Sequence, residues 1–269
     1  MKRGLYTIGF LCLSITAVLS GFRIVNYLVS EQKMKEEYAG LASEIAMPAL
    51  KAEKKEASGV AQIPDPAGSI GNDGEASWTF QDQYGALFEK NSDMIGWLSI
   101  PGTVIDYPVM QTPEEPDFYL HRNFNREYSP YGVLYAEEEC SIVPQSDNIT
   151  VYGHNMKNGT MYGSLEKYKE EEFYKTHPKV QFDTLAGFGV YEIIGVFKIS
   201  PKEFPYHQFI DASDPVEFDE YVNRVKELSF YETGITAGYG DKLITLSTCE
   251  YTKENNRLVV VARISFTDR

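Results

Sequence analysis

Short apolar runs separated by turn residues fill most of the chain after residue 90. Runs of this length between Gly, Pro, Asn, Asp and Ser are typical of β-strands, and many in succession indicate a barrel or a sandwich. The pattern therefore predicts a mainly β domain. Its strands are expected at residues 95–100, 104–109, 132–135, 148–152, 180–184, 189–198, 242–249 and 258–266.

Two segments have the spacing of a helix instead. Residues 80–90 repeat apolar positions at helical intervals and end at an Asn-Ser-Asp turn, which suits a short helix before the first strand. In the second segment, Asp214, Pro215 and Glu217 occupy the N-cap, first and third positions of a capping box. The apolar residues that follow, up to residue 229, share one face. We expect this longer helix to pack on the β domain rather than to carry chemistry.

The N-terminus carries an uncharged run, residues 4–22, between Arg3 and Arg23. As a helix it would span about 28 Å, close to the ~30 Å hydrocarbon core of a bilayer. A cleaved signal peptide has a shorter apolar region, roughly 7–15 residues, and a small-x-small cleavage site that residues 18–20 fit poorly. We therefore predict a single, uncleaved transmembrane signal-anchor over residues 1–23, with cleavage as the alternative. Because basic residues keep their end in the cytoplasm, the remaining chain is expected outside the cell membrane.

A stalk is expected between this anchor and the β domain, over residues 24–77. Residues 31–56 are rich in Glu, Lys and Ala, which favours a helix. Residues 57–77 are rich in Gly, Pro, Ala and Asp without an apolar period, which is typical of a flexible linker. The globular domain is then expected over residues 78–269.

The charge and the cysteine count exclude several classes of function. A net charge of −14 argues against nucleic acid as a partner, because phosphate binding needs a cationic surface. Three cysteines cannot form a disulfide scaffold, and Cys140 is most simply an incidental thiol, with a regulatory disulfide to Cys249 as a minor alternative. No CxxC, HxxxH or HExxH spacing occurs, so neither a metal nor another cofactor is expected.

The run 242–249 ends on a cysteine with polar neighbours. In a strand, Thr245, Ser247 and Cys249 share one face, because alternate side chains point the same way. The thiol would thus lie at the end of the strand, on its more polar face. A lone cysteine is also often just a small buried side chain, and this alternative stays open from the strand alone.

Arg257 directly precedes the next run, residues 258–266. If the two strands form a hairpin, Arg257 faces Cys249 across the loop ends. An arginine there can favour the thiolate and hydrogen-bond a developing oxyanion, although a plain surface arginine is the alternative. Arg263 lies further along the same face and is the fallback candidate.

A histidine could supply acid–base chemistry. His154 follows the run 148–152 and a glycine, which places it where a strand passes into a loop. Imidazole accepts and donates protons near neutral pH, but a structural loop histidine has the same surroundings. The other histidines, His121, His177 and His207, are expected in loops or at the surface.

Three segments together resemble the sortases, specifically class B. They are residues 152–156 (Tyr-Gly-His-Asn-Met), 245–250 (Thr-Leu-Ser-Thr-Cys-Glu) and 257–262 (Arg-Leu-Val-Val-Val-Ala). Segments 95–110, 119–124 and 159–163 also have counterparts in that class. The resemblance extends over roughly residues 78–266 and keeps the order His, Cys, Arg with matching flanks.

The resemblance implies a closed eight-stranded sortase-type β-barrel with N-terminal helices and one long helix before the cysteine strand. It also implies a cysteine transpeptidase of surface proteins. Cys249 would attack the carbonyl of a Thr in a C-terminal sorting signal, and His154 would protonate the leaving amine. Arg257 would hold the oxyanion or the substrate backbone. An amine on a cell-wall precursor or a pilin would then resolve the thioacyl-enzyme.

The same resemblance implies further contacts with the sorting signal and its surroundings, namely Leu120, Tyr152, Ser247, Thr248 and Glu250. One departure concerns an acidic-Asn pair that class B members usually carry before this Leu, where the present chain has Glu115 and Pro116. The loss of a donor at Pro116 predicts an altered motif preference. The acidic run 137–139 is expected to be a solvated turn rather than a calcium site.

Two other functions fit the same residues. A secreted cysteine peptidase would form the same intermediate and pass it to water instead of an amine. A non-catalytic module could bind cell-wall peptide on the same barrel, but the intact set of Cys249, His154 and Arg257 speaks against it. Acceptance of an amine separates the transpeptidase from the peptidase.

Overall fold

The described residues form eight strands, and each one corresponds to a strand expected from the sequence. The computed structural model describes residues 2–56, 79–249 and 255–265 of the 269. The strands are β1 (Met94–Ser99), β2 (Asp106–Met110), β3 (Leu134–Ala136), β4 (Asn148–Tyr152), β5 (Lys179–Thr184), β6 (Val190–Ile199), β7 (Leu243–Cys249) and β8 (Arg257–Ile264). β2 starts later than predicted because a tight turn precedes it, in which the Ile100 N–H donates to the Ile105 carbonyl at 2.9 Å.

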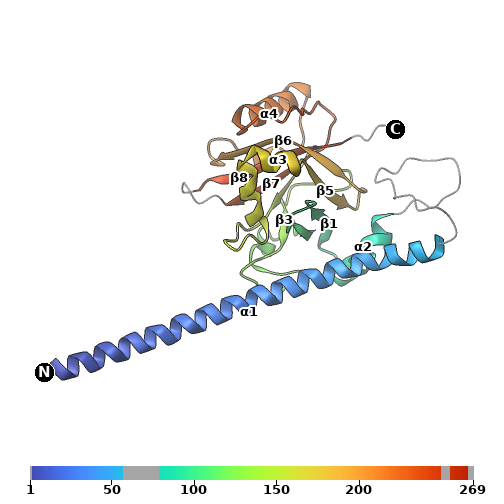
Figure 1. Cartoon of the computed structure of the whole chain (residues 1–269). Helices are drawn as coiled ribbons and strands as arrows, with labels where there is room; N and C mark the ends of the chain where they lie inside the picture. Colours follow the sequence, from blue (N-terminus) through green and yellow to red (C-terminus); the bar gives the residue numbers. More distant parts are fainter. Residues whose placement is uncertain (1, 57–78, 250–254, 266–269) are drawn as a thin grey trace. The chain divides into compact units, whose positions relative to one another are not determined.

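These strands form a closed barrel in the order β1-β2-β3-β4-β7-β8-β6-β5, with β5 paired to β1 (Figure 1). The prediction of a closed eight-stranded barrel is confirmed. Two neighbouring pairs are parallel, β2 with β3 and β4 with β7, and the other pairs are antiparallel. β4 and β7 therefore end at the same edge of the barrel, although β5 and β6 lie between them in the sequence.

Helix α2 (Phe80–Lys90) is the entry helix expected before the first strand. Thr79 caps it: the Thr79 hydroxyl accepts from the Asp82 N–H, and the Asp82 carboxylate accepts from the Thr79 N–H at 2.9 Å. This reciprocal pair is a capping box, which satisfies two backbone donors at the helix start. The other short helices are η1 (Phe118–His121), η2 (Tyr162–Lys169), α3 (Glu171–Thr176) and η3 (Tyr206–Gln208).

Helix α4 (Pro215–Leu228) is the longer helix predicted before the cysteine strand. Asp214 caps it as expected, accepting from the Val216 and Glu217 N–H groups at 2.8 and 3.0 Å. The predicted capping box is wrong in one detail. The Glu217 carboxylate accepts from the Ser213 N–H and hydroxyl at 2.8 and 2.6 Å, and not from Asp214. Ser213 offers this carboxylate two donors, so the returning contact lies one residue upstream.

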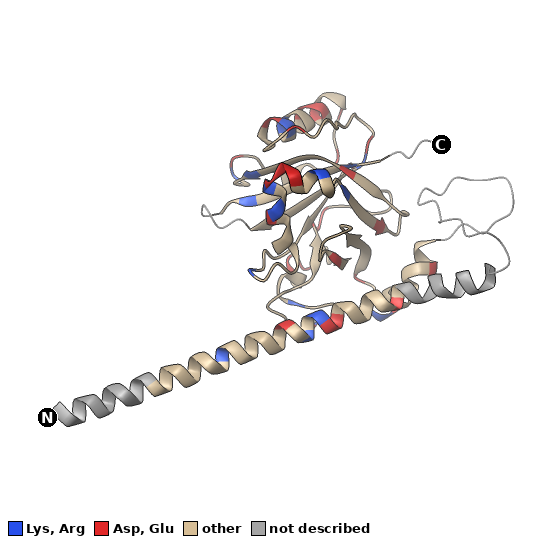
Figure 2. Cartoon of the chain, viewed as in Figure 1, with Lys and Arg blue, Asp and Glu red and all other residues tan. Residues whose placement is uncertain are grey.

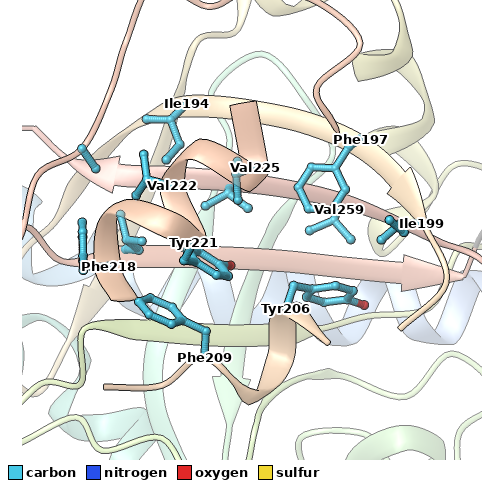
Figure 3. Packing of buried hydrophobic residues seen from close by; sticks show 13 residues of the cluster. Ile194, Phe197, Ile199, Tyr206, Phe209, Phe218, Tyr221, Val222, Val225 and Val259 are labelled. Atoms are coloured by element: carbon cyan, nitrogen blue, oxygen red, sulfur yellow. The ribbon is translucent and has the colours of Figure 1, made fainter. Parts of the chain in front are cut away.

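An apolar core joins α4 to the face of β6 and β8 that the helix covers (Figure 3). The ring of Tyr221 on α4 stacks on Phe209, with centroids 3.9 Å apart and an interplanar angle of 10°. Burying a side chain of this size contributes about 1.5–3 kcal/mol, so the helix is firmly attached. The prediction that α4 packs on the barrel is confirmed. The core also contains Ile194, Phe197, Ile199, Tyr206, Phe218, Val222, Val225, Val259 and Val261.

In the described part of the chain, charged residues lie mainly on the helices and loops and seldom along the strands (Figure 2). On α3, Lys175 lies 3.1 Å from Glu171, and on α4 Arg224 lies 3.0 Å from Glu227. Exposed pairs of this kind contribute only about 0–1 kcal/mol each. The barrel and the α4 core, rather than surface ion pairs, therefore stabilise the fold.

The N-terminal segment forms one helix, α1 (Lys2–Glu56), which confirms the helix expected over residues 31–56. The side chains of residues 4–13, in the predicted membrane span, and the predicted linker 57–77 lie outside the described part of the structure. Within the residues that are described, no helix is both long enough and apolar enough to cross a membrane. In that part of α1, Arg23 and Asn26 interrupt the apolar sequence.

The contact between β6 and α4 depends on Gly195. A Cβ at this position would lie 2.7 Å from Val225 Cγ1 and 3.2 Å from the Val225 carbonyl oxygen. We expect Gly195→Ala to push α4 away and to lower the free energy of unfolding by about 1–3 kcal/mol. Urea denaturation followed by circular dichroism measures this change. Gly238→Ala is the matched control, because a Cβ there meets nothing within 4 Å. Equal denaturation midpoints for both variants would contradict this packing.

Candidate active site

The parallel pairing of β4 with β7 brings His154 and Cys249 to one place. The register matches Tyr152 with Ser247 at the barrel edge. Two residues further along each segment lie His154 and Cys249, which therefore leave the same edge on neighbouring segments. Because alternate residues of a strand share a face, Cys249 starts from the face that carries Ser247, and His154 follows just past the end of β4.

The backbone of Gly153 is tied to β7 on both sides. Its N–H donates to the Ser247 carbonyl at 3.2 Å, and its carbonyl accepts from the Thr248 hydroxyl at 2.6 Å. A Cβ at Gly153 would lie 2.5 Å from Leu134 Cδ2, so a glycine is needed for this close approach. Thr248 thus points away from the Cys249 face and joins the two segments. Its contact with substrate stays a prediction.

The residue after His154 is tied to the cysteine itself. The Asn155 side-chain amide donates to the Cys249 carbonyl at 2.8 Å and to a Glu166 carboxylate oxygen at 2.7 Å. Asn155 is 6% exposed, so its hydrogen bonds are protected from water. Both neighbours of His154 therefore contact the end of β7, and the placement of the imidazole relative to the thiol depends on these backbone contacts.

Arg257 lies directly opposite Cys249 at the start of β8, as the hairpin predicted. Directly opposite residues share a face, so the guanidinium starts on the same side as the half-buried thiol. The charge of Arg257 also acts on His207 of η3. Burial lowers the pKa of His207, Glu138 raises it, and Arg257 lowers it further. A cation beside a thiol can stabilise the thiolate and an oxyanion formed on its substrate.

Arg263, the fallback candidate, lies at the other end of the barrel. It pairs with Leu243, six residues before Cys249 along β7. At ~3.3 Å per residue the separation is about 20 Å, which is too far for a shared site. Its guanidinium contacts Glu192 at 3.2 Å. The alternative role for Arg263 is therefore wrong, because shared faces do not imply proximity along a long strand.

A backbone carbonyl orients the His154 ring. Nε2 lies 2.7 Å from the carbonyl oxygen of Leu120 on η1. A carbonyl can only accept, so Nε2 carries a hydrogen and Nδ1 is the nitrogen that gains or loses the exchangeable proton. Burial lowers the pKa of His154, although the Leu120 carbonyl opposes this. Leu120 thus reaches the site through its backbone, and contact of its side chain with substrate stays a prediction.

Two tyrosines next to the site are each held by a carboxylate. The Tyr152 hydroxyl donates to Glu137, the Tyr135 hydroxyl donates to Asp117 at 2.7 Å, and their ring centroids are 5.4 Å apart. Burial and the neighbouring Glu138 carboxyl raise the pKa of Glu137 to about 7. The expected solvated turn at 137–139 is wrong for Glu137, since the β3–β4 pairing brings Tyr152 to its carboxylate.

Ser247 is buried beneath the η3 segment. Its hydroxyl lies 2.7 Å from the Tyr206 hydroxyl, and the side chain is 1% exposed. Burial raises the pKa of Tyr206 to about 12, so this phenol stays protonated at neutral pH. Tyr206 therefore covers β7 up to Ser247, and the half-buried Cys249 lies just beyond that cover.

Cys140 and Cys249 are both free thiols. Burial raises the pKa of the Cys140 thiol to about 12, which leaves it without nucleophilic thiolate at neutral pH. The interpretation of Cys140 as an incidental thiol agrees with its burial, and the structure contains no disulfide between these two cysteines.

One predicted site residue is not described by the structure, and three residues of the site were not predicted. Glu250 lies outside the described residues. Within the described ranges, no group of three or more His, Cys, Asp or Glu side chains is placed to hold a metal ion. The sequence did not indicate the roles of Asn155, Glu137 or Tyr206, since each acts through a partner distant in the chain. Only the position of Asn155 directly after His154 was a usable signal.

Comparison with known proteins places this arrangement in a family. The model of the sortase domain matches residues 98–265. Sortase B of Listeria monocytogenes is 32% identical over 68% of this chain and 74% of its own length. The structure of Clostridium perfringens sortase B is 32% identical with a TM-score of 0.63, covering 68% of this chain and 99% of that one. A Staphylococcus aureus sortase B–substrate complex shares the fold at 24% identity, with a TM-score of 0.72 over 89% of this chain and 100% of that one.

The matched region contains strands β2–β8, α4 and the residues His154, Cys249 and Arg257. The chain therefore belongs to the sortase family, in its class B.

Proposed function

We propose that this protein is a cysteine transpeptidase that cuts a C-terminal sorting signal after a Thr and joins the surface protein to an amine. One observation carries the proposal: Cys249 ends β7 between the His154 segment on β4 and Arg257 on β8. A nucleophile flanked by an acid–base group and a fixed cation suits acyl transfer. Family membership supports the same chemistry.

In the first half of the proposed reaction, the Cys249 thiolate attacks the Thr carbonyl carbon. The carbonyl π electrons move onto oxygen, and the Arg257 guanidinium stabilises that oxyanion. The carbonyl then re-forms as the C–N bond breaks, and His154 gives its Nδ1 proton to the leaving amine. The products of this half are a thioester on Cys249 and the released C-terminal peptide.

In the second half, an amine on a cell-wall precursor or a pilin attacks the thioester carbonyl. Neutral His154 accepts the proton that this amine loses, and Arg257 again stabilises the oxyanion. Collapse breaks the C–S bond and forms a new amide. The Cys249 thiolate and the protonated histidine are restored, so the cycle closes without a cofactor or a metal.

The proposed substrate is an extended peptide that reaches the ends of β4 and β7, where the half-buried Cys249 lies beyond the cover of η3. The related S. aureus sortase B was solved as a complex with its substrate, and its whole chain is covered by the present one. Tyr152 and Leu120 lie beside this end, whereas Ser247 is buried beneath Tyr206 and would act on the substrate only through that contact. We place the reaction at the cell surface, where sortases are found.

The first test uses peptides with Asn-Pro-x-Thr, Leu-Pro-x-Thr and Ser/Pro-Pro-x-Thr signals, with and without an amine, and mass spectrometry of the products. We expect cleavage after Thr and an amine-joined product. Cys249→Ala should lower the rate on the order of a thousand-fold or more, because no thioester can form. Cys140→Ala is the matched control and should keep near-normal activity.

Other outcomes of this test would replace the proposal. Hydrolysis that ignores added amine would make the protein a peptidase. Binding of a signal peptide by a folded protein that cleaves none of the panel would make it a binding module. Equal loss of activity in Cys140→Ala and Cys249→Ala would contradict the assignment of the nucleophile.

The role of Arg257 has its own test. Arg257→Lys keeps the positive charge but removes the planar set of N–H donors, so we expect kcat/KM to fall about a hundred-fold. Arg263→Lys makes the same change on the same strand, away from the thiol, and should stay within about three-fold of wild type. Steady-state kinetics with one peptide compares them. A similar decrease in both variants would mean that barrel stability, rather than oxyanion binding, explains the effect.

The contact between Asn155 and the Cys249 carbonyl generates a further expectation. Asn155→Ala removes the hydrogen bonds that fix the His154 segment to the end of β7, so we expect kcat to fall about ten-fold with little change in KM. Asn158→Ala, three residues further on in an exposed loop, is the control and should act like wild type. An unchanged kcat in Asn155→Ala would show that this contact does not position the site.

A further inference from the structure

A second histidine stacks on the first. The ring of His121, the last residue of η1, lies parallel to the His154 ring, with centroids 5.4 Å apart and an interplanar angle of 24°. The preceding residue, Leu120, supplies the carbonyl that binds His154 Nε2. Two consecutive residues of one short helix therefore hold the imidazole, one through its edge and the other through its face.

Helix η1 is itself fixed in place by a buried polar network. The hydroxyl of Tyr119 donates to Asp93 Oδ2 at 2.6 Å and accepts from the Asn91 amide at 2.8 Å. Arg126 Nε donates to the same Asp93 oxygen at 3.0 Å. Tyr119 is fully buried, so the position of its neighbours on η1 is well defined. His121 is exposed but starts from a rigid backbone.

The groups around the His121 and His154 rings come from several elements. On the side of His121, the Tyr128 ring lies 6.5 Å away, and Arg122 is turned onto the Phe118 ring at 4.1 Å.

The remaining elements packed near His154 carry few free charges among the described residues. β7 contributes the Cys249 thiol and β8 contributes Arg257 opposite it. On η2, Glu166 is paired with Lys169 at 2.6 Å and accepts from Asn155. The charge of His121 is the one that acts on His154 face to face.

We propose that His121 is a positioning residue for the reaction at Cys249: its ring holds the His154 imidazole, and its positive charge, when present, opposes protonation of that imidazole. This inference rests on the proposed transpeptidase function. Two parallel imidazoles in contact cannot both be charged without repulsion. His154 is therefore kept neutral to a lower pH than it would be beside an uncharged ring.

The electrostatics of the site agree with this geometry. Burial lowers the pKa of His154, the Leu120 carbonyl opposes that effect, and the positive charge of His121 lowers the pKa further. His121 is exposed to solvent, whereas His154 is half-buried. A positive charge on His121 would thus lower the fraction of His154 that carries the proton required by the leaving amine.

Nuclear magnetic resonance of the full chain labelled at histidine tests the pair directly. The chain has four histidines, so single variants assign their signals. His121→Phe keeps a flat ring and removes the charge, and His121→Gln removes both. In both variants we expect the midpoint of the His154 titration to move to higher pH. His177→Gln is the matched control, because that ring stacks on Phe173 at 4.1 Å in another part of the chain.

Each outcome of the histidine titrations either supports or overturns the inference. A higher midpoint in both His121 variants, with none in His177→Gln, supports the inference. An unchanged midpoint in both overturns it. A rise in His121→Gln alone also overturns it, because loss of stacking, and not loss of charge, would then be the cause. These titrations need no turnover, so a failure of the transpeptidase proposal would be seen separately in the peptide assay.

The reaction itself provides a second readout. Near pH 6 we expect His121→Phe, which lacks the imidazole charge, to exceed wild-type kcat/KM by about three-fold. At alkaline pH, above about 8, the two proteins should agree. A constant ratio across the pH range would point to a purely structural effect and would overturn the proposed role of the charge.

Discussion

The parallel pairing of β4 with β7 is the contact on which the rest of the site depends. Most neighbouring strands of this barrel run antiparallel and can be joined by short turns, but a parallel neighbour needs a long crossover. β5, β6, η3 and α4 all lie within that crossover. Because both strands end at one edge, residues that follow them are neighbours without any direct bond between their side chains. The antiparallel β7–β8 pair then adds Arg257 from the other side.

The crossover also determines how much of β7 is exposed. α4 and η3 cover the face that carries Thr245 and Ser247, with Tyr221 3.3 Å from the Thr245 hydroxyl and Tyr206 2.7 Å from that of Ser247. The cover stops there, and the next residue on the same face is the half-buried Cys249. Polar side chains deep in the face are thus satisfied by tyrosine hydroxyls, and the one reactive group is left accessible. A helix without catalytic residues therefore limits where a substrate can reach the strand.

Local patterns in the sequence predicted much of the fold, because strand runs, turn residues and the Asp214 cap act over a few residues. The facing of Cys249 and Arg257 was also predictable, since a hairpin has one simple register. The meeting of His154 with Cys249 required the resemblance to a family, because parallel pairing across a long crossover leaves no local signal. Contacts such as the Leu120 carbonyl and the Glu137–Tyr152 pair escaped prediction for the same reason. The Leu120 contact uses a backbone oxygen, which every residue has. An acidic run has the same sequence whether or not a tyrosine from another strand contacts it.

The period of two along β7 has a consequence for how such a chain can change in evolution. Inserting or deleting one residue between Thr245 and Cys249 would turn the thiol toward the opposite face and separate it from both of its partners. A change in the length of β4 or β7 would therefore destroy the site, whichever residue is added or removed. The segment between η3 and α4 is held in place as well, because Phe209 stacks on Tyr221 and its carbonyl accepts from the Asn148 side chain at 2.9 Å. The two strands and the crossover between them therefore constrain the length of the chain together.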